Sequence, residues 1–355
     1  MRNVPVQTVL GPIDVNEIGV TLMHEHTLRQ PPELAYAGKR EFSRSLRHAS
    51  VTASNAWLVR EDPYACLDNR ALTELQIVAE ELAVFSTAGG RTIVDNSNGL
   101  ERDPASLVRL AEATGVNIVM GSGRSTISEE TAEAFDTDPQ PYADALIAEH
   151  RFGIALPDGR RVRPGVIGEI GVGTTFNTSE RTGLAAAAIA QTQVGVPLLI
   201  HLPGWQRRGH EVLDIVLEYG VDPAAVVLCH MDPSGPDKQY QHELAARGVW
   251  LEFDMIGMLN NYPGEGQSPS VQETVDAVAG LIADGLQDQL LLSQDVGMKT
   301  MWTRYGGNGY GFVQTAFLPR LFDAGVDRSL KQTLLTTNPR SLFTSAQRAL
   351  EVLRT

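Results

Sequence analysis

The sequence has 355 residues, of which 43% are hydrophobic and 20% charged, a globular composition long enough for one large α/β barrel. Its 29 basic and 43 acidic residues give a formal net charge of −14, which argues against nucleic acid or an anionic membrane as a partner. No apolar run approaches the roughly 18 residues of a membrane-spanning helix, and the amino terminus shows no export signal. Cys66 and Cys229 are therefore expected to be reduced thiols in a cytoplasmic protein.

The chain begins with a short predicted hairpin over residues 4–18, with Gly-Pro at its turn. Short apolar runs, rich in Val, Ile and Leu, then alternate with longer amphipathic stretches. Each run is almost continuously apolar, as expected for a parallel strand that is buried on both faces. The eight predicted strands cover residues 19–26, 91–95, 116–121, 164–170, 197–201, 225–230, 249–254 and 289–295.

Apolar residues at three-to-four spacing mark helices between these strands. Helices are predicted over residues 69–88, 179–194, 207–219 and 270–286. The second of these should start at Ser179, with Glu180 in its first turn, and end before Gly195. Eight strands with helical crossovers predict a (β/α)8 TIM barrel in one domain over residues 1–355. A long polar insertion over residues 28–67, after the first strand, should fold over the barrel mouth.

Candidate metal ligands lie where the predicted strands end. The stretch "MHEH" places His24 and His26 two residues apart, so both imidazoles project from the same face of a strand. Alone, this pair could equally be two hydrogen-bonded polar residues. However, the carboxyl ends of barrel strands frame the active site, and later strands end in further ligand types. These are Glu169, His201, His230 and Asp295.

Six such ligands are too many for one tetrahedral zinc, but they are enough for two ions about 3.5–4 Å apart. Imidazole and carboxylate suit Zn, Mn, Co, Fe or Ni, and we favour zinc. Two metal ions held in this way would activate a bridging hydroxide as the nucleophile. Asp295 is then the predicted catalytic residue, which accepts the hydroxide proton and passes it to the leaving group. The alternative for Asp295 is a helix-capping role in "SQDVGM".

Motifs along nearly the whole chain resemble the phosphotriesterase-related family of binuclear metal hydrolases in the amidohydrolase superfamily, which includes phosphotriesterase-like lactonases. They are "VQTVLGPIDVNEIGVTLMHEH", "RTIVD", "RDP", "GEIGV", "LLIHLPG", "VLCHMDPS", "LLSQDV" and "TRYGGNGYGF". By this resemblance, the more buried ion is held by His24, His26 and Asp295. The more exposed ion is held by His201 and His230, and Glu169 bridges the two where some relatives use a carboxylated lysine.

Five further residues are candidate substrate contacts: Arg124, Ser125, Trp205, Arg304 and Tyr305. Family lactonases typically carry a tyrosine just after the "GxG" of the third strand, whereas "MGSGRST" places Arg124 and Ser125 there. Arg124 could bind an anionic group or pair with an acidic residue of the next loop. Arg304 and Tyr305 could contact substrate or form a structural turn, and Trp205 is expected to be a pocket wall.

The resemblance favours hydrolysis of a carboxylic ester or lactone, with phosphotriester cleavage as a possible side activity. The alternative is hydrolysis of a small anionic N-acyl amide, because residues 55–69 resemble a segment of the animal phosphotriesterase-related branch, whose members act on N-acyl amides and esters. Two other classes are an inactive relative that binds a ligand and a metal-dependent isomerase or decarboxylase. The first is disfavoured because all six ligand positions carry competent residues. The expected partners are a small-molecule substrate and, as in many relatives, a second copy in a homodimer.

Overall fold

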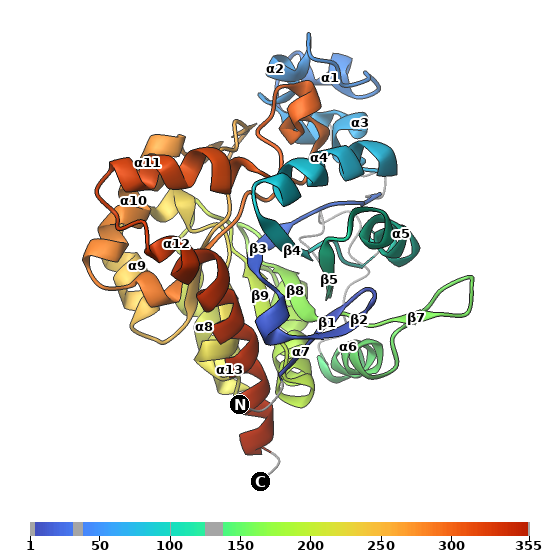
Figure 1. The fold of residues 1–355 in the computed structure, drawn as a ribbon, viewed down its shortest axis with the longest axis vertical. Helices are drawn as coiled ribbons and strands as arrows, with labels where there is room; N and C mark the ends of the chain where they lie inside the picture. The colour runs from blue at the N-terminus through green and yellow to red at the C-terminus, as the bar shows by residue number, and fades with distance from the viewer. Residues whose placement is uncertain (1–3, 31–37, 100, 125–137, 354–355) are drawn as a thin grey trace.

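A single curled sheet forms the centre of the molecule. The computed structural model describes residues 4–30, 38–99, 101–124 and 138–353. Eight parallel strands lie side by side in chain order and form a nearly closed barrel (Figure 1). They are β3 (Val20–Glu25), β4 (Gly90–Asp95), β5 (Asn117–Ser122), β8 (Val166–Gly171), β9 (Leu198–His201), β10 (Val226–Leu228), β11 (Trp250–Phe253) and β14 (Leu290–Leu292). The prediction of a (β/α)8 barrel is confirmed.

Alternate residues of these strands pack into two different apolar clusters, which explains why each run is continuously apolar. One cluster fills the inside of the barrel and includes Met23, Val94, Val119, Val166, Leu199, Val227 and Leu291. The other packs beneath the surrounding helices and includes Leu22, Ile93, Ile118, Ile167, Ile200, Leu228 and Leu292. The inside of the barrel is therefore a packed core and not an open channel.

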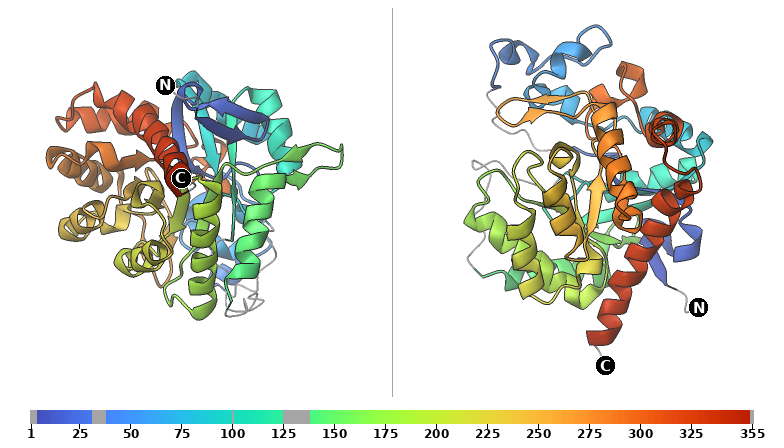
Figure 2. Two further views of the ribbon diagram at one scale, coloured as in Figure 1. Left: turned by 90° about the horizontal axis from the view of Figure 1, so that it is seen from below. Right: turned by 90° about the vertical axis from the view of Figure 1, so that its left-hand side faces the viewer.

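The hairpin of β1 (Pro5–Thr8) and β2 (Gly11–Asp14) closes the amino-terminal end of the barrel. Val6 and Val15 join the inner cluster from this side. The hairpin prediction is confirmed, although residues 9–10 make the turn and Gly-Pro begins β2 instead. Figure 2 shows the hairpin and both chain ends at this end, with the helices arranged around the sheet.

The long helix predicted over residues 69–88 is divided in two. α3 (Leu67–Arg70) ends early, and α4 (Leu75–Thr87) begins after an extended segment. Leu72 in that segment exchanges backbone hydrogen bonds with Arg29, at 2.9 and 3.0 Å. Tertiary pairing therefore overrides the local helical periodicity at this point.

Helix α7 (Thr178–Val194) starts one residue before the prediction. Its cap is Asn177, which accepts from the Glu180 backbone N–H while the Glu180 carboxylate accepts from the Asn177 backbone N–H. This reciprocal pair satisfies two free donors of the first turn. The predicted end is confirmed, because Gly195 takes the left-handed conformation, φ 67°, that glycine adopts without a Cβ clash.

The insertion after β3 contains α1 (Ser43–Leu46), α2 (Ala56–Val59) and α3 around a small core of Leu46, Val51, Val59 and Cys66. Its Arg60 side chain donates to the carbonyl of Thr300 (2.8 Å), and the Arg60 carbonyl accepts from the Asn261 backbone N–H (2.8 Å). These partners follow β14 and β11, so the insertion lies at the carboxyl end of the strands, opposite the chain ends (Figure 1). Both cysteines are buried and free, as predicted.

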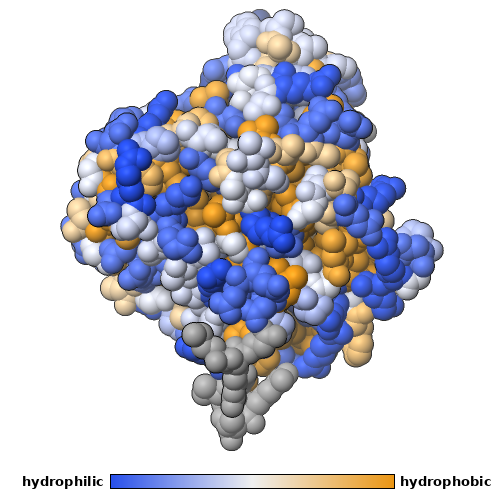
Figure 3. Space-filling model, viewed as in Figure 1, coloured by the Kyte–Doolittle hydropathy of each residue, from blue (hydrophilic) through white to orange (hydrophobic). Residues whose placement is uncertain are grey.

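The other helices are α5 (Pro104–Thr114), α6 (Gln140–Phe152), α8 (Gly209–Glu218), α9 (Lys238–Ala245), α10 (Val271–Ala283), α11 (Leu318–Asp323), α12 (Leu330–Gln332) and α13 (Asn338–Leu353). Two small hairpins are formed by β6 (Ile154–Ala155) with β7 (Arg161–Val162) and by β12 (Asn261–Tyr262) with β13 (Gly266–Gln267). The predicted helices over residues 207–219 and 270–286 correspond to α8 and α10. On the face in Figure 3, hydrophobic residues show mainly in recesses between hydrophilic ones. In the described part of the chain, no helix combines the length and apolarity that crossing a bilayer requires.

Candidate metal centre

All six residues that the sequence singled out as ligands lie together at the carboxyl end of the barrel. Two irregularities in the strand pairing direct three of these side chains toward the inside of the barrel. The pairing of β3 with β4 shifts between Leu22 and Glu25, and the pairing of β8 with β9 shifts between Ile167 and Ile170. Each shift inserts one extra residue, so the side chains that follow change face. The first bulge turns both histidines of "MHEH" inward, and the second turns Glu169 inward.

One half of the cluster joins β3 to the end of β14. The His26 Nε2 lies 3.2 Å from Asp295 Oδ1. The His24 Nε2 lies 3.8 Å from the same Asp295 oxygen and 3.5 Å from Glu169 Oε2. The second Glu169 oxygen, Oε1, lies 3.7 Å from His26 Nε2. Both carboxylates therefore face both imidazoles.

The other half of the cluster lies at the ends of β9 and β10. Glu169 Oε2 is 2.9 Å from His201 Nδ1 and 3.3 Å from His230 Nε2. The two imidazole nitrogens are themselves only 2.8 Å apart. Among the residues that the structure describes, Glu169 is thus the carboxylate that reaches all four histidines, which is the position a bridging ligand needs.

The donor set and its spacing fit divalent ions. Two ligand atoms that each stand about 2.1 Å from a tetrahedral ion are roughly 3.4 Å apart. The separations between 3.2 and 3.8 Å on the β3 side bracket that value. In addition, the fully buried Nε2 of His24 has no hydrogen-bond partner among the described residues, although it faces two carboxylates. A buried polar atom of this kind is rare unless a missing ligand satisfies it.

The electric field at the cluster also favours cations. Burial lowers the pKa of His230, but Asp254 and Glu169 outweigh burial and raise that pKa well above its ordinary value. Burial raises the pKa of Glu169, but His201 and His24 outweigh it and hold that pKa well below its usual range. His230 therefore lies in a negative potential that a metal ion would neutralise in place of a proton.

Asp254 orients two of the histidines, although no sequence motif marks it as a site residue. Its carboxylate lies 2.8 Å from His230 Nδ1 and 3.1 Å from His24 Nδ1, and it accepts from the His230 backbone N–H. At His230 the contact is a hydrogen bond, and at His24 it is an ion-pair contact without hydrogen-bond geometry. Both lie on the Nδ1 side of the ring, which leaves Nε2 toward the cluster. A signal was present, because Asp254 is the last residue of the predicted seventh strand.

Replacing Asp254 by asparagine should weaken metal binding by about 10- to 100-fold, because an amide holds both imidazoles less firmly in one tautomer. The measurement is competition with a chelator of known affinity, on protein whose fold is checked by circular dichroism. The control is Asp284→Asn, which removes an exposed carboxylate 3.0 Å from His242. Equal metal affinity in both variants would contradict this role.

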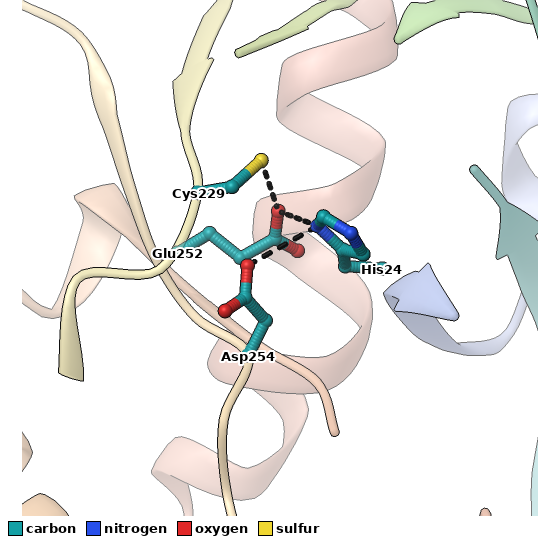
Figure 4. A group of neighbouring side chains, drawn as sticks. All are labelled: His24, Cys229, Glu252 and Asp254. Atoms are coloured by element: carbon teal, nitrogen blue, oxygen red, sulfur yellow. Dashed lines mark hydrogen bonds and ion pairs between the residues drawn. The ribbon is translucent and has the colours of Figure 1, made fainter. Parts of the chain in front are cut away.

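A second buried group lies behind His24, away from the other ligands. Figure 4 shows Cys229, Glu252 and Asp254 around the His24 ring. The Cys229 thiol donates to Glu252 Oε2 (3.4 Å), and the same oxygen lies 3.6 Å from His24 Nδ1. Burial raises the pKa of both Cys229 and Glu252, so the thiol stays protonated and acts as a donor. These three side chains pack against the ring of His24 from the barrel interior.

Glu25, the glutamate of "MHEH", joins the first barrel strand, β3, to the segment after the last one, β14. This junction of β3 and β14 is the seam of the barrel. The Glu25 carboxylate accepts from the Ser293 hydroxyl (2.8 Å) and from the backbone N–H groups of Gln294 (2.9 Å) and Val296 (2.8 Å). The Asp295 backbone N–H donates to the carbonyl of His24 (3.1 Å). These bonds fix Asp295 against the first strand.

His230 and Asp295 both adopt left-handed backbone conformations, with φ of 60° and 49°. Residues other than glycine seldom adopt this region, and such strain persists where the surroundings enforce it. Both residues are among the six, so the fold holds their side chains in directions that a regular strand would not give.

The predicted substrate contacts are less closely grouped. The Arg124 guanidinium lies over the Tyr142 ring of α6, 5.7 Å from its centre, and Ser125 lies outside the described residues. Trp205 packs against Tyr262 (5.8 Å between ring centres), as a pocket wall would. Arg304 is exposed, and its backbone N–H donates to Glu81 of α4 (3.2 Å). Tyr305 stacks on Trp302 (6.3 Å), so the contacts of Arg304 and Tyr305 match the structural turn, one of the two roles predicted for them.

Together, the fold and this cluster define an α/β barrel with a histidine–carboxylate centre at the carboxyl ends of its strands. The sequence model of the Phosphotriesterase family matches residues 4–343, and the chain belongs to that family. The N-acetyltaurine hydrolases of Tetraodon nigroviridis and Homo sapiens are 33% and 31% identical to it over 344 residues, covering 96% of this chain and 97% of theirs.

Solved structures share the fold of this chain. A resiniferatoxin-binding protein from Rhodobacter sphaeroides superposes with a TM-score of 0.88 at 43% identity, covering 96% of this chain and 95% of that one. A lactonase from Listeria monocytogenes superposes with a TM-score of 0.73 at 21% identity, covering 96% and 98%. At that identity the lactonase shares the fold, and its activity carries no weight for this chain.

Proposed function

We propose that this protein is a binuclear metal-dependent hydrolase that cleaves the acyl C–N bond of a small anionic N-acyl amide. The observation that carries the proposal is the convergence of four imidazoles on the Glu169 carboxylate, with Asp295 beside them. The names of the relatives at 31–33% identity support an amide substrate. The ester or lactone preference drawn from the sequence is not confirmed, so we place it second.

Zinc is the proposed metal, because it takes imidazole and carboxylate in this spacing. When bound, the two ions would supply an activated water and polarise the acyl carbonyl. Asp295 has the more exposed of the two ligand carboxylates, with 19% of its side chain accessible against 8% for Glu169. Its carboxylate accepts a proton from the attacking water as the new C–O bond forms. It then donates that proton to the leaving nitrogen as the C–N bond breaks, giving a carboxylic acid and an amine.

Arg124 is a candidate for one of the contacts to the anionic group of the substrate. Replacing Arg124 by alanine should then raise KM roughly tenfold for an anionic N-acyl amide and spare a neutral one, because only the former loses a charge-assisted hydrogen bond. The measurement is a pair of Michaelis curves on the two substrates. Equal KM changes for both would assign Arg124 to the packing of α6 through Tyr142.

A hydrolysis panel on zinc-loaded protein tests the proposed function. N-Acetyltaurine, an N-acetyl amino acid, a neutral lactone, an aryl ester and a phosphotriester are compared, with Asp295→Asn as the inactive control. Preference for the two anionic amides supports the proposal, whereas preference for the lactone or ester overturns it. No Asp295-dependent turnover on any of them would favour the ligand-binding class instead.

A further inference from the structure

Arg29 lies three residues beyond His26, where the first strand leaves the barrel. Its backbone is fixed by the two hydrogen bonds it exchanges with Leu72 and by bridge pairing with Arg102. The side chain is 13% exposed, so it is mostly enclosed but not sealed from solvent. No motif of the sequence marked this residue.

The Arg29 guanidinium lies beside the metal centre. The link is Gly297, which follows Asp295 by two residues. A Cβ built on Gly297 would lie 3.2 Å from Cδ2 of His26, 3.5 Å from Nη1 of Arg29 and 3.7 Å from the carbonyl oxygen of Asp295. Gly297 therefore borders the guanidinium, the His26 ring and the backbone of Asp295 at once, which places the guanidinium beside these two ligands.

The hydrogen-bonding capacity of Arg29 is largely unused within the described residues. Its Nε is buried and has no hydrogen-bond partner there, and its ion pair joins Nη2 to Glu101 Oε2 at 3.3 Å. Burial lowers the pKa of Arg29, but Glu101, Tyr64 and Asp295 outweigh burial and raise it, so the group stays charged. A guanidinium has five donors, and an enclosed one with so few partners suits a bidentate anion.

We propose that Arg29 binds the anionic group of the substrate, a sulfonate or carboxylate, while Glu101 holds the guanidinium in position. This assignment rests on the proposed amide hydrolysis and makes Arg29 a specificity-determining residue of the same site. The planar fork of arginine matches two oxygens of either anion. A neutral amide of the same length would leave these donors unpaired and bind less well.

The test compares wild type with Arg29→Gln, both loaded with zinc, on three substrates of matched length. N-Acetyltaurine and N-acetyl-β-alanine carry a sulfonate and a carboxylate, and N-acetylethanolamine is neutral. KM for the two anions should rise about 10- to 100-fold in Arg29→Gln, with kcat nearly unchanged and the neutral substrate unaffected. Arg29→Lys keeps the charge without the fork and should restore part of the loss. The ratio of the wild-type KM values separates the sulfonate from the carboxylate.

Two further variants separate binding from a merely structural ion pair. Glu101→Gln removes the counter-charge but keeps an oxygen that can accept from the guanidinium and hold it in position, so KM for the anions should stay unchanged or fall. The matched control is Arg160→Gln, because Arg160 is an exposed arginine that also pairs with carboxylates, those of Asp158 and Glu112. It should leave KM and kcat unchanged for all three substrates. Parallel KM increases in Arg29→Gln and Glu101→Gln, extending to the neutral substrate, would overturn the assignment.

Calorimetric binding of N-acetyltaurine keeps this proposal distinct from the proposed function. If the wild-type protein hydrolyses none of the substrates, the proposed amide hydrolysis is refuted. The binding experiment still decides the role of Arg29 in that case. Binding that Arg29→Gln weakens at least about tenfold supports the anion site. Absent binding, or equal binding by both proteins, refutes it.

Discussion

Replacing Asp295 by asparagine should lower kcat by about 10²- to 10⁴-fold, the usual contribution of a general acid–base group. The amide has the same shape but cannot accept the proton of the attacking water. The fold should survive, because asparagine tolerates the left-handed backbone that Asp295 adopts, φ 49°, and the bond from its backbone N–H to the His24 carbonyl is kept.

The measurement is steady-state kinetics with metal content determined on the same samples. Asp284→Asn serves as the surface control. Turnover within a few-fold of wild type would remove Asp295 from proton transfer. If metal content falls in step with kcat, Asp295 acts mainly as a ligand, so the two assays together distinguish its two proposed roles.

Replacing Glu169 by glutamine should have the largest effect on metal content. Loss of an outer partner alone costs about 10- to 100-fold in affinity, and Glu169 would be a direct ligand, so we expect a loss beyond 100-fold. The reason is electrostatic, because the variant leaves four imidazoles facing a neutral amide. Elemental analysis of purified protein checks this, with the exposed Glu243→Gln as control.

Full occupancy of two ions in Glu169→Gln would contradict a bridging role. A protein that keeps one ion would show that the two halves of the cluster bind independently. In that case the β3 half, with His24, His26 and Asp295, is the one expected to remain occupied, because its ligands do not depend on Glu169 alone.

The strands and the six clustered residues could be predicted from the sequence because both follow from short-range patterns. Continuous apolar runs mark buried parallel strands, and the carboxyl ends of those strands must meet at one end of a barrel. The same rule would have found Asp254. It could not show the bulges in β3 and β8, although these decide which neighbouring residue points inward.

Other parts of the site depend on contacts between distant segments. Glu25 meets partners 268 to 271 residues away, and the segment around Leu72 loses its helical form by pairing with Arg29. Arg29 and His26 come to lie on either side of Gly297, about 270 residues later in the chain, only once the barrel has closed. Such contacts leave no periodic trace in the chain, so sequence patterns cannot report them.

The seam between the first and last strands has a consequence for synthesis of the protein. His24 leaves the ribosome 271 residues before Asp295, whose backbone N–H donates to the His24 carbonyl. A nascent chain that ends before β14 has the histidines of the centre but neither the Asp295 ligand nor the Glu25 contacts that hold the barrel shut. Binding of both ions should therefore wait until β14 and the residues after it have been made. Chains truncated before residue 290 should not hold two ions, however much zinc is supplied.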